Sequence, residues 1–235
     1  MPVALITGAS KGIGLATAKQ LLQSGWRVVN FSRSPSPAVG VENHAIDLSA
    51  ADAETRVGQV IGEILPRSDQ QQIALIHNAA KLQNDTADNL TAASFENIIR
   101  INVLGPHILN QAIIPRMRDG SSILYIGSTL SEKAVPNSYS YVTTKHAMVG
   151  QMRATCQDLA GSGIHTACIC PGFTDTEMLR EHVDHSDEVL ESVSGMSAFG
   201  RLIAPEEIAA TITFAADNPV LNGSVIHANL GQVER

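Results

Sequence analysis

The sequence is poor in aromatic residues, holds few cysteines and has no long apolar run. Aromatic side chains make up only 4% of the 235 residues, so a core must rely on Val, Ile, Leu and Ala. Cys156, Cys168 and Cys170 do not suggest a disulfide framework, and the last two are spaced for one face of a strand rather than for a zinc site. No segment approaches the length of a transmembrane helix. These absences argue against a disulfide scaffold and against a membrane-spanning protein.

Positive charge is also scarce. Lys and Arg number 16 against 23 Asp and Glu, for a formal net charge of -7, which argues against nucleic acid or an anionic membrane as a partner. An apolar, strand-like run begins at Val3, so we expect no signal peptide and a cytoplasmic location. With 44% hydrophobic residues, a chain of this length predicts one compact domain over residues 1–235.

A glycine-rich turn follows the first apolar run. Residues 2–7 read as a buried strand, Gly8, Gly12 and Gly14 come next, and residues 15–24 have the apolar spacing of a helix. Glycines between a strand and a helix let backbone N–H groups approach a pyrophosphate, and the helix N-terminus adds positive potential. The spacing Thr-Gly-x-x-x-Gly-x-Gly therefore predicts a dinucleotide phosphate site, with a plain tight turn as the alternative.

The second expected strand, residues 26–31, is followed by Ser32 and Arg33 rather than by an acidic residue. An acid at this position would hold the ribose hydroxyls of NAD, whereas a guanidinium forms charge-assisted hydrogen bonds with a 2′-phosphate. Lys11, in the glycine turn, offers a second cation. The sequence therefore favours NADP over NAD; the alternative is that Arg33 is an ordinary surface residue.

The third expected strand, residues 44–48, contains Asp47 near its end. This carboxylate either accepts a hydrogen bond from the adenine amino group or caps a helix that starts near Ala50 and runs to Leu65. The sequence favours neither interpretation over the other.

Small and polar residues follow two further expected strands. After residues 72–76, His77 is interpreted as a strand-end residue rather than a catalytic base, and residues 78–80 are small enough for the backbone to pass close to a ligand. Ser128 follows the strand expected over residues 121–126. Because the carboxyl ends of parallel strands lie at one sheet edge, where ligands bind, we expect these residues to face the same crevice.

A long helix is expected from Thr91 to Arg116, with Asn102 inside it and a bend at Gly105-Pro106. A buried amide among apolar neighbours needs hydrogen-bond partners. Asn102 is therefore either a structural residue or part of a proton relay.

Tyr141 and Lys145 lie four residues apart in a helix expected over residues 138–159, and so share one face. A nearby ammonium favours phenolate, so we predict that the pKa of Tyr141 falls from about 10 towards neutrality, where a phenol gives or takes a proton. The pattern Tyr-x-x-x-Lys occurs often by chance, and only the rest of the chain gives it meaning.

The last third of the chain predicts a sixth strand over residues 164–170, a polar and irregular segment over 177–200, a helix that opens at Pro205 and a seventh strand over 224–228. His182 and His185 lie near acidic residues, but no third ligand is fixed by spacing, so we predict a solvated segment and no metal site. Strands that alternate with helices predict an α/β fold: a doubly wound, mostly parallel seven-stranded sheet with helices on both faces, Rossmann-like, in a single domain.

Taken together, these segments resemble the short-chain dehydrogenase/reductase family over essentially the whole chain, nearest in motifs to 3-oxoacyl-carrier-protein reductase-like members. The motifs fall in the family's order: Thr7-Gly8 with Gly12 and Gly14, Asn78-Ala79, Asn102, Ser128, Tyr141 with Lys145, and Pro171-Gly172 through Thr176. The resemblance implies an NADP-dependent oxidoreductase that transfers a hydride between the nicotinamide and a carbonyl or secondary alcohol.

The resemblance also implies roles for single residues. Tyr141 would be the general acid/base, Lys145 would lower its pKa and hold the nicotinamide ribose, and Ser128 would bond the substrate oxygen. Asn102 would hold a water that links Lys145 to solvent. NADP(H) would be held by Gly8, Ser10, Lys11, Gly12, Ile13, Gly14, Ser32, Arg33, Asp47, Leu48, Asn78, Ala79, Tyr141, Lys145, Pro171, Gly172, Thr174 and Thr176.

Further expectations concern the lid, the partners and the alternative function. The resemblance implies a substrate lid at about residues 177–200, a small-molecule substrate and a homodimer or homotetramer. The chain departs from the family pattern at His77 and Ala80, and residues 227–235 lack the usual Asp-Gly-Gly ending, which bears on oligomer contacts. The alternative is a catalytically inactive NADP-binding regulatory protein on the same fold, against which the intact set of four catalytic residues argues.

Overall fold

Seven strands form one sheet in the order β3-β2-β1-β4-β5-β6-β7, and every neighbouring pair is parallel. The computed structural model describes residues 1–66 and 70–233. The strands are β1 (Val3–Thr7), β2 (Arg27–Ser32), β3 (Glu42–Ala45), β4 (Ile73–His77), β5 (Ser122–Ile126), β6 (His165–Pro171) and β7 (Ser224–Ala228). The strand order reverses between β1 and β4, which leaves a crevice at their carboxyl ends. The predicted doubly wound sheet is confirmed.

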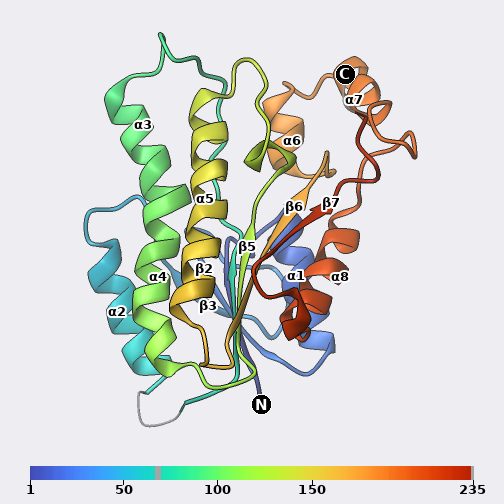
Figure 1. The fold of residues 1–235 in the computed structure, drawn as a ribbon. Coiled ribbons are helices and arrows are strands. Elements are labelled where there is room, and N and C mark those ends of the chain that lie inside the picture. Colours follow the sequence, from blue (N-terminus) through green and yellow to red (C-terminus); the bar gives the residue numbers. More distant parts are fainter. Residues whose placement is uncertain (67–69, 234–235) are drawn as a thin grey trace.

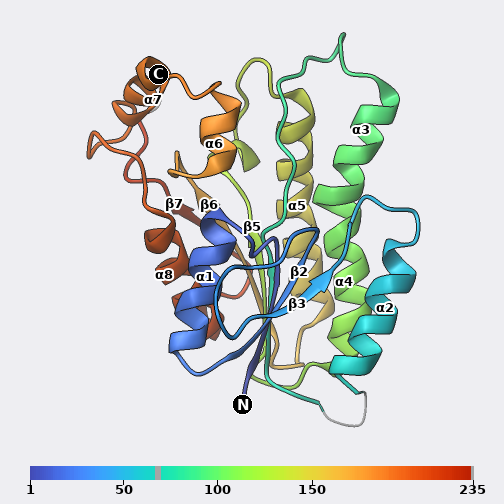
Figure 2. The same cartoon turned by 180° about the vertical axis from the view of Figure 1, so that it is seen from behind.

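Helices cover both faces of this sheet (Figures 1 and 2). One face carries α2 (Ala53–Ile64), α3 (Ala92–Ile99), α4 (Gly105–Ile113) and α5 (Tyr139–Asp158), and the other carries α1 (Gly12–Gln23) and α8 (Pro205–Ala216), which pack on each other. The short helices α6 (Glu177–His182) and α7 (Asp187–Ser194) lie at the carboxyl end of the sheet. The glycine turn, the end of β5 and the first turn of α5 are thereby brought to one end of the molecule.

Alternation along the strands supplies both layers of the core. In β1, Val3 and Leu5 belong to one apolar cluster, while Ala4 and Ile6 belong to the other, because successive side chains of a strand point to opposite faces. Every residue of β1, β4 and β5 is buried. Strands covered on both faces need such continuous apolar runs, which is why they are readable in the sequence.

The helix expected from Thr91 to Arg116 is interrupted. It consists of α3, a π-helical turn (Arg100–Leu104), α4 and a final 3-10 turn (Ile114–Arg116). Pro106 has no N–H to donate back to the carbonyl group of Asn102, and the wider turn accommodates this loss. The bend expected at Gly105-Pro106 is therefore preceded by a π-turn that contains Asn102.

Two other segments differ from the expectations. The strand expected over residues 44–48 covers Glu42–Ala45, and the next helix begins at Ala53 rather than near Ala50, because the side chain of Asp47 holds a turn at Ser49. The segment over 177–200, expected to be irregular, contains α6 and α7, whose first turns are capped by the hydroxyls of Thr176 and Ser186.

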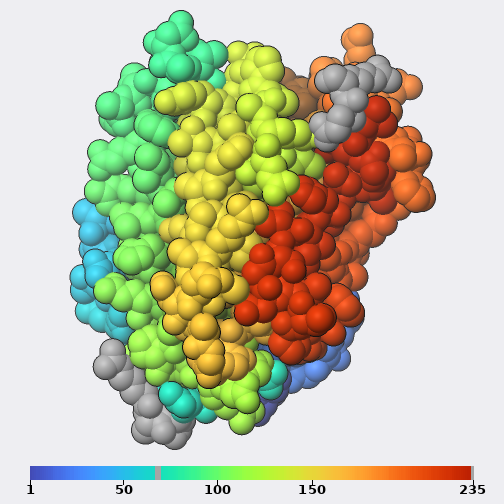
Figure 3. Space-filling model, in the orientation of Figure 1, coloured from blue at the N-terminus to red at the C-terminus, as the bar shows by residue number. Residues whose placement is uncertain are grey.

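One broad face of the molecule is formed by α5, with α4 on one side and the segment that follows α8 on the other (Figure 3). Among the described helices, none has both the length and the apolar character needed to cross a membrane.

Candidate active site

The glycine turn after β1 requires glycine both for its backbone angles and for close packing. Gly8 and Gly12 have φ angles of 74° and 54°, in the left-handed region that favours glycine. At Gly14, an added Cβ would lie 2.2 Å from the carbonyl oxygen of Gly8 and 2.5 Å from Nδ2 of Asn78. This cradle, formed by Gly8, Gly12 and Gly14, therefore tolerates no side chain at the buried Gly14, because the start of α1 packs closely on the ends of β1 and β4.

Thr7 and Asn78 join the ends of β1 and β4, where the strand order reverses. The Thr7 hydroxyl accepts the N–H groups of Asn78 and Ala79 at 3.0 and 2.9 Å. The Asn78 amide donates to the carbonyl oxygens of Thr7 and Gly8 at 3.0 and 3.1 Å. The residues named in the Thr-Gly and Asn-Ala motifs are thus in direct contact, at the edge where a dinucleotide would lie.

Asn30 is a residue of this cradle that sequence reasoning missed. It is buried in β2, and its Oδ1 accepts the N–H of Ala9 at 2.9 Å. Its amide nitrogen donates to the Ser32 hydroxyl at 3.0 Å and to Oδ1 of Asn43 at 2.9 Å. The sequence does indicate such a role for Asn30, because a polar side chain inside an otherwise apolar strand needs hydrogen-bond partners.

The residues expected around the adenosine end lie beyond β2 and β3. Arg33 is exposed, and Leu48 is buried. Hydrogen bonds from the hydroxyl and N–H of Ser49 lower the pKa of Asp47, and the charge of Arg33 contributes to this shift. Asp47 therefore caps a short turn before α2 rather than the first turn of α2 itself.

Lys11, expected as a second cation for a 2′-phosphate, forms an ion pair with Glu181 of α6 at 3.1 Å. Both side chains are largely exposed, so the pair is weak and open to exchange. In the same region, an added Cβ at Gly12 would lie 3.2 Å from Cγ2 of Thr176. The start of the segment over 177–200 therefore lies against the glycine turn.

Tyr141 and Lys145 lie one turn apart in α5, as their spacing predicted. The ammonium nitrogen of Lys145 is 5.3 Å from the centre of the Tyr141 ring. Lys145 is 2% exposed, and its Nζ donates to the carbonyl oxygen of Ile126 at 2.6 Å. A lysine from α5 is thus fixed to the end of β5, two residues before Ser128.

Ser128 caps the short turn that follows β5. Its Oγ accepts the N–H of Leu130 at 3.1 Å, and its own N–H donates to Oγ of Ser131 at 3.1 Å. An added Cβ at the preceding Gly127 would lie 2.8 Å from both Cys168 and Cys170 sulfurs. Tight packing of this glycine therefore fixes the direction in which the chain leaves β5.

The two sulfurs behind Gly127 lie 3.8 Å apart, and both side chains are buried. They are core residues, as expected from their spacing. The hydrogen bond between the thiols, with burial, raises the pKa of Cys168, whereas the same bond lowers the pKa of Cys170. Among the described residues, no group of three or more His, Cys, Asp or Glu side chains is arranged to hold a metal ion.

Asn102 connects the π-turn to two other segments. Its Oδ1 accepts the N–H of Lys81 at 2.8 Å, and its Nδ2 donates to the Lys81 carbonyl oxygen and to Oγ1 of Thr144, each at 3.0 Å. Thr144 in turn donates to the carbonyl oxygen of Tyr141 at 3.0 Å. Asn102 thus has a structural role, which leaves its expected part in a proton relay as a proposal.

Residues after β6 form the wall next to α6. The N–H of Gly172 donates to the carbonyl oxygen of Ala228 at 3.1 Å, and the Thr174 hydroxyl donates to the Gly172 carbonyl oxygen at 3.1 Å. Pro171 is the last residue of β6, and Thr176 caps α6 by accepting the N–H of Leu179. This places the expected Pro-Gly and Thr residues between β6 and the glycine turn.

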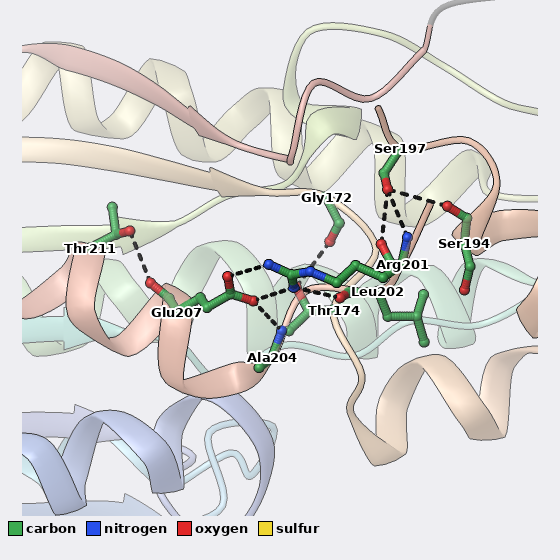
Figure 4. A network of polar contacts seen from close by, with 9 residues as sticks. All are labelled: Gly172, Thr174, Ser194, Ser197, Arg201, Leu202, Ala204, Glu207 and Thr211. Carbon is green, nitrogen blue, oxygen red and sulfur yellow. Dashed lines mark hydrogen bonds and ion pairs between the residues drawn. The ribbon is translucent and has the colours of Figure 1, made fainter. Parts of the chain in front are cut away.

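A polar network holds the far end of the segment over 177–200 (Figure 4). Arg201 donates to both carboxylate oxygens of Glu207 at 2.7 and 2.8 Å, and Glu207 also accepts the N–H of Ala204 at 2.8 Å. These bonds, with that of Arg201 first, lower the pKa of Glu207 to about 2. The segment is therefore anchored to the first turn of α8 at one end and lies against the glycine turn at the other.

Known proteins match this chain over nearly its whole length. The family model described as enoyl-(acyl carrier protein) reductase matches residues 8–232. The chloroplastic NADPH-dependent aldehyde reductase 2 of Arabidopsis thaliana is 29% identical over 254 residues, which cover 97% of this chain and 93% of that protein. A 3-oxoacyl-acyl-carrier-protein reductase of Staphylococcus aureus is 28% identical over 242 residues, which cover 97% and 96%.

Among solved structures, the ligand-free aldohexose dehydrogenase of Thermoplasma acidophilum has a TM-score of 0.91 at 23% sequence identity, covering 98% of this chain and 93% of that chain. The fold, the switch in strand order and the glycine cradle define a dinucleotide-binding α/β protein. More narrowly, the chain belongs to the short-chain dehydrogenase/reductase family, and is an enzyme of this NAD(P)-dependent oxidoreductase class, as the motifs predicted.

Proposed function

We propose that this protein is an NADP(H)-dependent oxidoreductase that interconverts a carbonyl group and a secondary alcohol, with Tyr141 as general acid/base. The observation that carries the proposal is the bond from buried Lys145 to the Ile126 carbonyl oxygen. The bond joins α5, which carries both Lys145 and the Tyr141 ring beside its ammonium, to the end of β5, two residues before Ser128 in the chain. A positive charge next to a phenol favours the proton transfer that reduction of a carbonyl group needs.

Each residue has a separate task in the reduction. Tyr141 donates its phenolic proton to the carbonyl oxygen, and Lys145 favours the phenolate that remains. Because Ser128 Oγ already accepts an N–H from Leu130, its hydroxyl hydrogen is available to donate to the substrate oxygen. Asn102 fixes the turn of α5 between Tyr141 and Lys145 through Thr144, and holds a water that connects Lys145 to solvent. Bound NADPH supplies the hydride.

The cofactor is NADP(H), and the residues present fit it. The missing side chain at Gly14 lets the start of α1 pack on Gly8, which keeps the helix N-terminus at the turn where a pyrophosphate would lie. Arg33 is exposed directly after β2, where its guanidinium is open to a 2′-phosphate, and its charge acts on nearby Asp47. The NADPH dependence in the name of the aldehyde reductase relative supports this choice. Lys11 joins this site when it leaves Glu181.

The remaining cofactor contacts follow the strand ends. They comprise Gly8, Ser10, Gly12, Ile13, Ser32, Asp47, Leu48, Asn78, Ala79, Pro171, Gly172, Thr174 and Thr176, in addition to Tyr141 and Lys145. Residues 177–200 act as the substrate lid, because they connect the glycine turn to α8 across the carboxyl end of the sheet. Reductases of aldehydes and of 3-oxoacyl thioesters among the relatives support a small carbonyl compound as substrate.

The test uses purified protein, NADPH and a panel of aldehydes, ketones and 3-oxoacyl thioesters, with absorbance of NADPH as the signal. Tyr141→Phe removes the proton donor and retains the ring over Lys145, so turnover should fall by about 100-fold or more while NADPH still binds. Tyr139→Phe is the matched control, because Tyr139 is 44% exposed and lies two residues away on another side of the helix.

Three outcomes are distinguishable. Loss of turnover in Tyr141→Phe alone supports the proposal. A Tyr141→Phe variant as active as the parent shows that the phenol has another role. A parent that binds NADPH but reduces nothing in the panel favours the inactive regulatory protein, and gel filtration of the same sample tests the proposed homodimer or homotetramer.

A further inference from the structure

Asp85 is an acidic side chain in the loop between β4 and α3, with 3% of its surface exposed. One carboxylate oxygen accepts the N–H of Ser140 at 2.8 Å, and the other accepts the Ser140 hydroxyl. Ser140 is itself fully buried. A buried carboxylate is costly unless strong hydrogen bonds compensate the loss of water, so this contact has to be maintained for the loop to stay in place.

Ser140 lies at the start of α5, where backbone N–H groups need hydrogen-bond partners from outside the helix. Ser140 is the second residue of α5, and the first N–H groups of a helix have no partner inside the helix. Ser138, at the usual capping position, makes no side-chain cap. Asp85 therefore caps α5 from a segment 55 residues earlier in the chain, and its negative charge lies at the positive end of the helix.

The main chain strengthens the same contact. The N–H of Asp85 donates to the carbonyl oxygen of Asn137 at 3.1 Å, and the N–H of Tyr139 donates to the carbonyl oxygen of Asp85 at 3.3 Å. Together they form a short parallel bridge between Asp85 and Ser138. In Figures 1 and 2 the segment between β4 and α3 runs alongside the first turns of α5. The entry into α5 is thus held by side chain and backbone together.

We propose that Asp85 is a positioning residue that sets where the Tyr141 phenol lies relative to Lys145; the inference rests on the function proposed above. Tyr141 follows Ser140 directly and belongs to the capped first turn. Lys145 lies one turn further on and is fixed separately, by its bond to Ile126. Loss of the cap therefore loosens the phenol while leaving the ammonium in place.

The experiment compares Asp85→Ala with Asp85→Asn. Alanine removes the cap, whereas asparagine keeps an oxygen that accepts the Ser140 N–H, so it should rescue most of the loss. Thr91→Ala is the matched control, because Thr91 caps α3 in the same way, accepting the N–H of Ser94 at 3.2 Å, and lies on another helix. All kcat values are divided by the number of sites that bind NADPH, which removes the contribution of unfolded protein.

We expect Asp85→Ala to lower kcat by roughly 10- to 100-fold, the effect of a small misplacement of a reacting group, with the KM for NADPH unchanged. Asp85→Asn should lie between this variant and the parent, and Thr91→Ala should keep the parental kcat. A purely structural role of Asp85 would instead lower the number of NADPH-binding sites at constant kcat per site, and this result would overturn the inference.

A second measurement decides the question even if no substrate is found. The chain contains three tyrosines, so protein labelled with 13C at the tyrosine ring gives a simple spectrum in which Tyr141→Phe identifies one signal. The Tyr141 signal should move in Asp85→Ala and stay in Thr91→Ala. An unchanged Tyr141 signal in Asp85→Ala refutes the inference. A moved signal supports the inference even if the parent protein shows no reductase activity, and the missing activity then counts only against the proposed function.

Discussion

Gly14 lies so close to Gly8 that an added Cβ atom would stand 2.2 Å from the Gly8 carbonyl oxygen. The other near neighbour, the amide of Asn78, is also fixed, because it donates to the Gly8 and Thr7 carbonyl oxygens. We predict that Gly14→Ala distorts the cradle and abolishes NADPH binding, measured by the change in NADPH fluorescence on titration. A lower melting temperature should accompany this loss, because relief of the clash requires movement of the backbone.

Gly58→Ala and Gly62→Ala are the controls for this substitution. Both glycines lie inside α2, and nothing within 4 Å would meet an added Cβ. Each should stabilise the protein by about 0.5–1 kcal/mol, because alanine loses less conformational entropy in a helix. If Gly14→Ala binds NADPH as the parent does, close packing at Gly14 is not needed to hold the cofactor.

Most of the fold is readable from the sequence because parallel strands buried on both faces leave continuous apolar runs. The strands at residues 3–7 and 122–126 were placed to within one residue, and each is fully buried. The short third strand was misplaced, because its alternating burial is that of an edge strand with no apolar run. The π-turn around Asn102 was not predicted, since the same apolar spacing continues through it.

The candidate site was predictable where chemistry is concentrated in a motif, and was missed where a single polar residue acts at a distance. Tyr141 and Lys145 share a helix face, so spacing alone placed them together. Asp85 bonds a residue 55 positions away, and an aspartate in a polar loop carries no sign of such a partner. The pairing of Lys11 with Glu181 likewise depends on the tertiary fold.

Arg33 gives a test of cofactor choice. We predict that Arg33→Ala raises the KM for NADPH by roughly tenfold or more and leaves the KM for NADH unchanged, because only the 2′-phosphate loses a charge-assisted hydrogen bond. Steady-state kinetics with both cofactors measure the two constants. An equal rise with NADH, or no rise with NADPH, would show that Arg33 is an ordinary surface residue.

Asn102 gives a test of how the site is held together. Asn102→Leu should lower the free energy of unfolding by about 2–4 kcal/mol, because the N–H and carbonyl groups of Lys81 are left without their partner. Thr144→Val removes only the Thr144 bonds and should cost less. Urea unfolding measures both values, and similar costs for the two substitutions would show that the amide contributes mainly through Thr144 rather than through Lys81.

Because His77 is buried, we predict that the folded protein loses stability in acid. Its Nε2 contacts Oδ1 of Asn110 at 2.8 Å, and its ring lies 4.8 Å from that of Tyr125. Burial lowers its pKa from 6.5 to about 4, although the bond to Asn110 opposes this shift. Among the described residues its Nδ1 has no partner, so a proton added there would gain no hydrogen bond.

The stability of the folded protein depends on pH because the pKa of His77 differs between the unfolded and folded chain. The unfolded chain takes up a proton at His77 near pH 6.5, and the folded protein does so only near pH 4, so stability is full above pH 6.5 and falls as the pH drops towards 4. At about 1.4 kcal/mol per pH unit, the complete loss is about 3 kcal/mol. His77→Gln should weaken this dependence, whereas His107→Gln, at an exposed position, should keep it. Urea unfolding of the three proteins at pH 7.5 and pH 5 measures the difference, and equal pH dependence in all three would show that acid acts on the fold through other groups.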